Sequence, residues 1–365
     1  MTVFLALRDL RRGIRRFVLL GIVVALVALL STVLSGLASG LVTDGISGLR
    51  ALPLEHLAFQ DGADATFSRS TLRGDAVEAF TAVDGVEATP IGATFVNATS
   101  PDGGPSIDIA LFGVASDTFL VADDDAAAAL DDGEPGLVLD AEMAEDGVEV
   151  GDRYVMGGSG VELPVVAFTD IGSYGHAPIA FVPLETWQQV QYGADVDDRF
   201  SAVALRGASK ADLQRAAGDD IEVLTRTEAY AGSPGYTAET TTMTLIRGFL
   251  LVISALVVGA FFTVLTVQRT RQIGLLKAMG AGNGYVARDA VGQMTILVAL
   301  ATGVGVAVGI GIVGALAGTD APVELDPPSV ATVAVLLVAS GVIGSLVAIR
   351  RITQVEPAIA LGVEP

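Results

Sequence analysis

The side chains that most often carry catalysis are scarce in this sequence of 365 residues. His56 and His176 are the only histidines, Lys210 and Lys277 are the only lysines, and cysteine is absent. One chain therefore cannot form a multi-histidine metal site, a reactive thiolate or a disulfide. The strings of a phosphate-binding loop, an HExxH zinc site and a GxSxG nucleophile are also missing. We expect no catalytic residue, no metal site and no ATP hydrolysis of the usual kind in this chain.

The most informative local pattern is a basic and apolar segment at residues 268–282. Its side chains Ile273, Leu276 and Met279 fall close to one face of a helix, with basic groups beside them. Gly280 and the Gly-Asn-Gly turn that follows would end this helix. Such a helix either lies on the inner surface of a membrane or docks into a groove of a cytoplasmic partner.

Four long runs without Asp, Glu, Lys or Arg would position this segment. They cover residues 17–41, 248–267, 290–317 and 329–349. At about 1.5 Å rise per residue, each run is long enough to cross a hydrocarbon core of about 30 Å as a helix. A buried core helix would explain any one of these runs but not all four. We therefore expect four transmembrane helices.

The first run also allows a second interpretation, an export signal that is cleaved. Arg15 and Arg16 precede it, and Leu37-Ala38-Ser39 is loosely similar to a cleavage site. However, its 25 uncharged residues exceed an ordinary signal core, and three more runs follow. A retained first span is favoured.

Basic residues set the expected orientation in a plasma membrane. They gather in the tail 1–16, the loop 268–289 and the tail 350–365, as Arg8, Arg11, Arg12, Arg15, Arg16, Arg269, Arg271, Lys277, Arg288, Arg350 and Arg351. With four spans these segments share one side, which the positive-inside rule assigns to the cytoplasm. Both termini are predicted to be cytoplasmic.

Residues 45–240 are predicted to form a large acidic domain outside the membrane, with 34 acidic and 9 basic residues. This acidity suits solubility in salty surroundings or near a cell wall, and a cation-collecting vestibule is the alternative. It speaks against nucleic acid as a partner.

Short β-like runs alternate with turn signals in this domain, which predicts an α+β fold of undetermined strand order. A hairpin is expected from 95–97 to 107–114, further strands at 136–139, 153–156 and 163–168, and helices at 141–145, 184–192 and 210–217. In the third apolar run, Gly305 and Gly309 form a GxxxG pair, which favours close helix packing within the subunit or across a dimer.

The segment from Arg269 to Ala281 resembles the R-x-x-x-I-G-x-L-x-A-x-G-A signature of FtsX/MacB-type ABC permeases. Those proteins have one span, a large outer domain and three further spans, and the segment 355–361 resembles their P-x-x-A-L ending. The resemblance implies a homodimer in membrane lipid that works with a separate ATPase subunit, which binds ATP and Mg²⁺. The implied ATPase-coupling residues are Ile273, Gly274, Leu276, Lys277, Met279, Gly280 and Gly282.

Residues 5–12, 49–53, 173–178 and 184–188 resemble the haem-exporter (HrtB/DevC-like) branch of that family. This resemblance implies haem as the transported substrate, with no cofactor held by the chain. The side chains able to ligate haem iron in the outer domain are Tyr174, His176, Glu142 and Met143. The alternative is that Tyr174 and His176 only hold a turn before Pro178, and that Glu142 and Met143 belong to the surface and the core.

Three other functions stay open from the sequence. The first is export of a lipid, peptide or antibiotic by the same kind of permease. The second is an FtsX-like signalling protein that activates a cell-wall hydrolase, although no long coiled coil is seen. The third is a membrane-bound enzyme, against which the lack of a catalytic constellation argues.

Overall fold

The computed structural model describes residues 14–101, 103–115, 118–131, 134–193, 198–268, 275, 279–319 and 321–353. The chain divides into two units. We call residues 1–41 with 240–365 the helical unit, and Val42–Glu239 the α+β unit.

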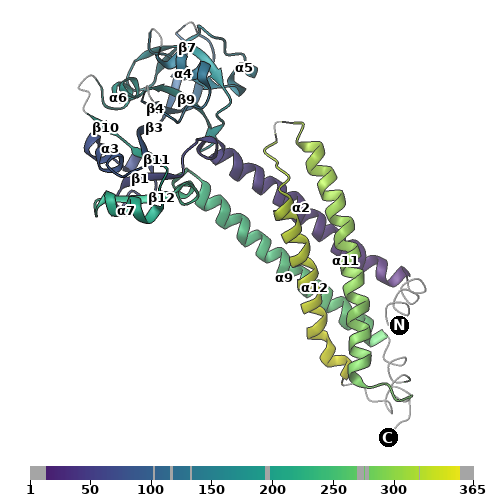
Figure 1. Ribbon diagram of the computed structural model, residues 1–365. Coiled ribbons are helices and arrows are strands. Elements are labelled where there is room, and N and C mark those ends of the chain that lie inside the picture. Colours follow the sequence, from purple (N-terminus) through teal and green to yellow (C-terminus); the bar gives the residue numbers. More distant parts are fainter. Residues whose placement is uncertain are drawn as a thin grey trace. The chain divides into compact units, whose positions relative to one another are not determined.

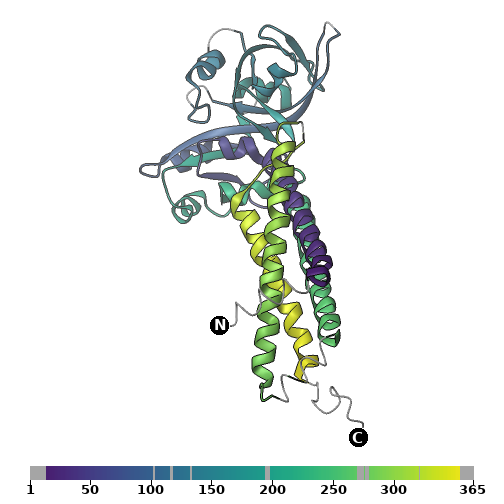
Figure 2. The ribbon, with the colours of Figure 1, turned by 90° about the vertical axis from the view of Figure 1, so that its right-hand side faces the viewer.

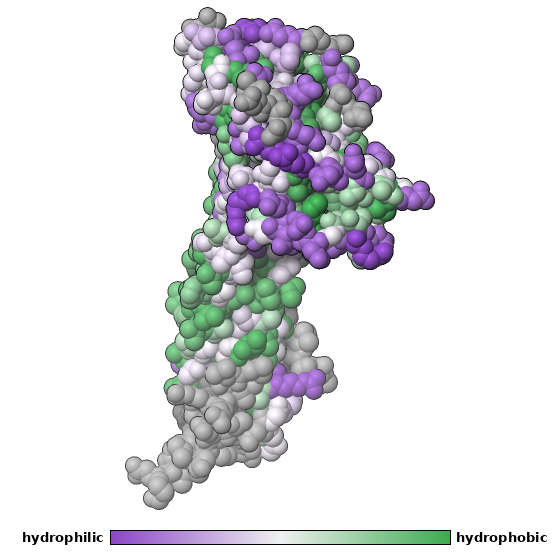
Figure 3. All heavy atoms as spheres, turned by 90° about the vertical axis from the view of Figure 1, so that its left-hand side faces the viewer, coloured by the Kyte–Doolittle hydropathy of each residue, from purple (hydrophilic) through white to green (hydrophobic). Residues whose placement is uncertain are grey.

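Among its described residues, the helical unit contains four helices that are long and apolar enough to cross a membrane. They are α2 (Ile14–Ala51), α9 (Tyr236–Gln268), α11 (Asn283–Leu316) and α12 (Pro327–Thr353), of which α2 and α9 extend into the α+β unit (Figure 1). Within the helical unit they run side by side in both ribbon views (Figure 2). Hydrophobic residues dominate the visible surface of this unit, and hydrophilic residues that of the α+β unit (Figure 3). The predicted fold class is confirmed: four apolar helices, with an α+β domain between the first two.

Glycine allows α11 to approach α2 closely. A Cβ atom added to Gly305 would overlap the Ala25 carbonyl oxygen, and one added to Gly309 would lie 2.7 Å from Thr32 Cβ. In lipid, helices associate through such van der Waals packing because the solvent itself is apolar. The GxxxG pair therefore packs within the chain.

We expect Gly305→Ala to destabilise the helical unit by about 1–3 kcal/mol, because its methyl group would meet backbone that cannot turn aside. Gly303→Ala is the matched control, since a Cβ there meets open space. Thermal unfolding of both variants in detergent checks the prediction. Equal melting temperatures would contradict the packing of α11 on α2.

The α+β unit is built on one large sheet. The described strands are β1 (His56–Gln60), β2 (Leu72–Arg73), β3 (Glu87–Thr99), β4 (Ile107–Val114), β5 (Leu137–Asp140), β6 (Arg153–Met156), β7 (Glu162–Thr169), β8 (Ser173–Tyr174), β9 (Ala177–Pro183), β10 (Arg199–Phe200), β11 (Ala202–Arg206) and β12 (Ile221–Thr225). Ten of them form the order β12-β1-β11-β3-β4-β9-β5-β7-β6, with β8 attached to β9, while β2 pairs with β10.

The long strand β3 closes part of this sheet on itself. Its first half pairs with β11, its other edge pairs with β4 from residue 91 to 98, and its end pairs with β6. The strands from β3 through β4, β9, β5, β7 and β6 therefore form a closed ring. Only the β4–β9 and β5–β7 pairs are parallel among the described pairings.

Short helices cover the sheet and its connections. They are η1 (Phe67–Arg69), α3 (Gly74–Thr81), α4 (Asp124–Asp131), α5 (Glu142–Glu145), α6 (Leu184–Tyr192), α7 (Lys210–Ala217), α8 (Arg226–Ala229) and η2 (Tyr230–Gly232). The capping box between Thr225 and Glu228 starts α8, and Ser209 caps α7.

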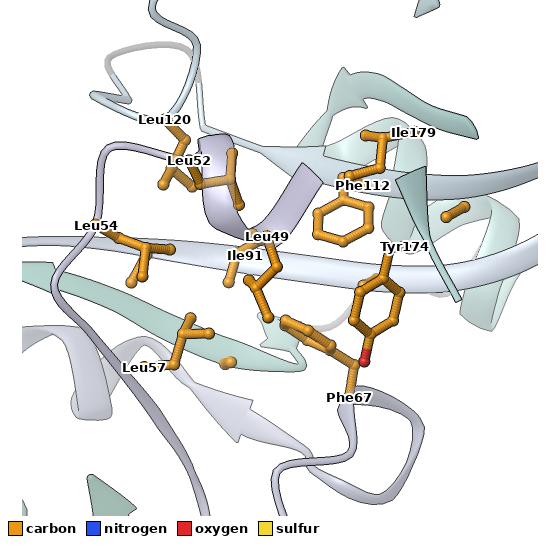
Figure 4. Packing of buried hydrophobic residues seen from close by; sticks show 14 of the residues in the cluster. Leu49, Leu52, Leu54, Leu57, Phe67, Ile91, Phe112, Leu120, Tyr174 and Ile179 are labelled. Carbon is orange, nitrogen blue, oxygen red and sulfur yellow. The ribbon is translucent and has the colours of Figure 1, made fainter. Parts of the chain in front are cut away.

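Alternate residues of the strands supply two apolar cores. In β4, Ala110 and Phe112 belong to one core, and Ile109 and Leu111 belong to the other. Successive side chains of a strand point to opposite faces, so the cores lie on the two faces of the sheet. The last turns of α2 enter the first core through Leu49 and Leu52, both buried beside Phe67 and Phe112 (Figure 4).

Two cross-strand glycines make room for the single tryptophan. Gly92 and Gly113 are direct partners in the β3–β4 pair, and a Cβ on either would overlap the Trp187 side chain. Trp187 itself, on α6, is 1% exposed. The tryptophan in the segment that resembles haem exporters is therefore a core residue.

Candidate functional site

A tight hairpin brings the outer histidine to the helix ends. Strands β8 and β9 pair through Ser173–Pro178 and Tyr174–Ala177, which leaves Gly175 and His176 as a two-residue loop. Both loop residues have positive φ, 59° and 65°. This is the pattern of a type I′ turn, whose twist matches that of the flanking strands.

The imidazole of His176 lies between two carboxylates from different helices. Its Nδ1 is 2.8 Å from Asp44 Oδ2 on α2, and its Nε2 is 3.0 Å from Glu239 Oε1 on α9. The side chain of His176 is 33% exposed, so the group is partly shielded from water. We call these three residues the His176 cluster.

The geometry of the His176 cluster favours the imidazolium form. A neutral imidazole has one donor nitrogen and one acceptor nitrogen, whereas both nitrogens here face carboxylate oxygens. The hydrogen bond to Asp44, with a further contribution from Glu239, raises the pKa of His176 despite partial burial. The cluster therefore joins α2 and α9 through one shared cation.

Backbone contacts hold the same hairpin to the last turns of α2. The Gly175 amide donates to the Gly45 carbonyl at 2.9 Å, and the Ser173 amide donates to Ser47 Oγ at 2.8 Å. The Ser233 hydroxyl, just before α9, donates to the Gly45 carbonyl at 2.8 Å. Residues 42–51 of α2 and the start of α9 are thus fixed to one β-hairpin within the α+β unit.

Tyr174 faces the interior of the domain. It is 3% exposed and its hydroxyl donates to the Gly232 carbonyl at 3.0 Å. Its ring contacts Phe67 and Phe112 edge to face and stacks on Phe95 (Figure 4 shows the first two). Burial raises the pKa of the Tyr174 hydroxyl. These four aromatic residues line a cavity of about 270 Å³, which we call the aromatic cavity.

The other two predicted haem donors lie on α5. Met143 is buried in the second core, and Glu142 is exposed. Partial burial and neighbouring carboxylates, Asp140 and Asp44 among them, raise the pKa of Glu142. Of the four candidates, Tyr174 and Met143 are buried in the cores, whereas His176 is partly exposed and lies on the hairpin that contacts α2 and α9.

Sequence reasoning missed both carboxylates of the His176 cluster. Asp44 is the first acidic residue after the first uncharged run, and Glu239 is the last acidic residue before the second. This placement could have indicated both residues, because charged residues at the ends of membrane spans often form ion pairs. Their shared partner, His176, is 132 residues from Asp44, and only the fold brings it there.

A family comparison identifies the helices that follow the α+β unit. Residues 244–357 match the model described as FtsX-like permease C-terminal. This part of the chain is similar to the C-terminal domain of FtsX-like permeases. It contains most of α9 and all of α11 and α12, which are among the helices long and apolar enough to cross a membrane.

Curated relatives match a wider region. A protein of Staphylococcus epidermidis named hemin transport system permease protein HrtB is 22% identical over 229 residues, 62% of this chain and 63% of its own length. The protein of that name from Staphylococcus haemolyticus is 23% identical over the same shares. The chain thus spans less than two thirds of the length of these relatives.

Among solved structures, the extracellular domain of the noncanonic ABC-type transporter YknZ from Gram-positive bacteria covers 47% of this chain and 98% of its own length. The identity is 18% and the TM-score is 0.30. At this TM-score the comparison adds nothing to the fold assignment, which follows from the strands and helices of the chain itself.

The predicted coupling segment lies within residues 244–357, the part that matches the FtsX-like permease model. Ile273, Gly274, Leu276 and Lys277 lie outside the described residues, as does the segment 355–361. Met279 is 69% exposed, Gly280 has a φ of 98°, and Gly282 is the N-cap of α11. A glycine turn thus precedes α11, and an apolar side chain beside it is open to solvent or a partner.

Proposed function

We propose that this chain is the permease subunit of an ABC-type exporter that extrudes haem or a similar amphiphile and is driven by a separate ATPase subunit. The observation that carries the proposal is the FtsX-like permease match over 244–357, together with the hemin-transport names of relatives that align over 229 residues. By its resemblance to that family, the subunit would work as a homodimer with two copies of a separate ATPase chain, which would bind and hydrolyse the ATP.

The geometry of the hairpin supports a mechanical mode of export. The ends of α2 and α9 are bonded to one hairpin and to each other through the His176 cluster. A movement of either helix would therefore be passed to the α+β unit instead of being absorbed in a loop. ATP-driven closure of the partner would pull the segment 268–282, move α9 and α2, and displace the amphiphile outward.

The proposed substrate is haem, with His176 as the favoured iron donor. Neutral imidazole ligates iron, so His176 must lose a proton and leave at least one carboxylate before it binds haem. The aromatic cavity lies behind the neighbouring Tyr174 and offers apolar side chains for a flat ring. Tyr174, buried and hydrogen-bonded, would support the site by packing.

Haem titration of the solubilised protein, followed by absorbance, tests this assignment. We expect a saturable Soret shift in the parent, a shift lost in His176→Ala and retained in Tyr174→Phe, which keeps the ring. Binding should strengthen as the pH rises through the raised pKa of His176, because the neutral ring is the ligand. If the parent shows no shift, and cells lacking the protein tolerate haem equally well, the substrate is another amphiphile.

The proposed orientation places both termini and the segment 268–289 in the cytoplasm. Because the chain has no cysteine, single cysteines report the side of the membrane directly. We expect Gly103→Cys, in the β3–β4 loop, to react with an impermeant thiol reagent in intact cells, and Gly282→Cys to react only after permeabilisation. Labelling of Gly282→Cys in intact cells would rule out the four-span arrangement.

A further inference from the structure

A second cavity, of about 430 Å³, lies within the helical unit. Its lining comes from three helices: Ser31 of α2, Arg247 and Leu251 of α9, and Thr332, Val333 and Leu336 of α12. Apolar side chains, one arginine and several hydroxyl groups therefore share one space. We call it the Arg247 cavity.

Arg247 is the charged group of this cavity, and its charge is not balanced within the described residues. Its Nη2 donates to Ser35 Oγ at 3.0 Å, while its buried Nε has no hydrogen-bond partner. Among the residues that the structure describes, no ion pair is formed by Arg247. A guanidinium beside hydrocarbon is costly unless an anion accompanies it.

Ser31 supplies a second, independent sign of a missing ligand. It is 4% exposed, lines the same cavity, and its hydroxyl has no hydrogen-bond partner. The threonine hydroxyls around the cavity are different, since Thr244 donates to the Thr240 carbonyl and Thr332 to the Pro328 carbonyl. A buried polar group without a partner costs about 1–3 kcal/mol, which a bound acceptor would recover.

We propose that the Arg247 cavity binds the phosphate of an anionic phospholipid, which stays as a structural ligand of the helical unit. Arginine presents a planar fork that suits phosphate oxygens, and Ser31 would donate a further hydrogen bond. The acyl chain would lie along Leu251, Val333 and Leu336, of which Leu336 is 44% exposed at the surface of the helices.

The depth of Arg247 agrees with a lipid headgroup. Arg247 directly precedes the uncharged run 248–267, at the end of that run which follows the α+β unit in the chain. With the orientation proposed above, this end faces the outer leaflet. A resident lipid is favoured over a transported anion because the guanidinium needs its counterion at all times, and not only during transport. Asp326 accepts a hydrogen bond from the Ser329 amide and offsets the partial positive charge at the start of α12. The guanidinium of Arg247 therefore supplies the main attraction for the phosphate.

Native mass spectrometry of the full chain tests the proposal without ATPase or haem, so its outcome is separate from that of the proposed function. The detergent-purified protein is exchanged into phosphatidylglycerol or phosphatidylcholine. We expect one phosphatidylglycerol retained per chain, at least tenfold more tightly than phosphatidylcholine, and a raised melting temperature. Arg247→Gln should lose this preference, and Arg288→Gln, which removes an exposed arginine of α11, should keep it.

Gly248→Leu provides a second test if Arg247→Gln does not fold. Gly248 lines the cavity and a Cβ there meets open space, so leucine fills the cavity without a clash. We expect this variant to fold and to lose the retained lipid. Equal retention of both lipids by the parent, or unchanged phosphatidylglycerol retention in both cavity variants, would overturn the proposal.

Discussion

With His176 replaced by asparagine, the ends of α2 and α9 should come loose from the hairpin while the hairpin itself survives. Asparagine tolerates the positive φ of this turn position but brings no cation. The loss is two charge-assisted hydrogen bonds in a partly exposed group, so we expect about 1–2 kcal/mol of destabilisation below pH 6. Hydrogen exchange should rise at residues 42–51 and 236–239.

The pH dependence of this effect has a definite sign. The folded pKa of His176 is raised above its ordinary value of about 6.5. The stabilisation is therefore fully present below about pH 6.5 and is lost as the pH rises through the raised folded pKa. The melting temperatures of the parent and His176→Asn should differ at pH 6 and converge at higher pH. A difference that is constant with pH would show that the imidazolium does not join the two helices.

Asp44→Asn and Glu239→Gln separate the two halves of the His176 cluster. Each should remove one ion pair and part of the stabilisation, and neither should add much to His176→Asn, because all three residues share one interaction. Full additivity of the three substitutions would indicate independent local effects in place of a cluster.

Replacing Leu276 with aspartate should uncouple ATP hydrolysis by the partner from export. The variant should insert and fold normally, since the sequence predicts that the segment lies between spans and outside the hydrocarbon. If the segment docks on the ATPase as proposed, the variant should lose about 2 kcal/mol or more of binding free energy, or roughly thirtyfold in affinity. The measurement is co-purification of the ATPase and the rate of export in cells.

Val150→Asp is the control for this substitution. Val150 is an exposed apolar residue of the α+β unit. Val150→Asp therefore makes the same apolar-to-acidic change at a position far in sequence from the segment 268–282. It should leave ATPase binding and export unchanged. Normal co-purification and export by Leu276→Asp would mean that the segment is only a helix on the membrane surface.

Strong local patterns were predictable from the sequence. The β3–β4 hairpin, the strand at 153–156 and the helices at 184–192 and 210–217 agree with the structure because their apolar spacing and turn residues are local signals. Strands β1, β11 and β12 were not predicted. They are short, and pairing partners from both ends of the domain stabilise them.

The candidate site depended on contacts that no local pattern encodes. The sequence singled out His176, but its partners Asp44 and Glu239 come from the two helices that enter and leave the domain. The burial of Tyr174 could not be predicted for a similar reason, because it depends on Phe67 and Phe112 on other elements. The haem-ligand assignments and the coupling residues remain predictions.

Reconstituted transport tests the central claim most directly. The chain is purified with the proposed ATPase subunit, placed in proteoliposomes, and supplied with haem and ATP. We predict that haem movement needs both chains and hydrolysable ATP, and that haem stimulates the rate of ATP hydrolysis. Leu276→Asp should abolish haem movement, and Val150→Asp should not. Equal haem movement without ATP would contradict ATP-driven export of haem. A rate of ATP hydrolysis that is unchanged by haem and by Leu276→Asp would also contradict it.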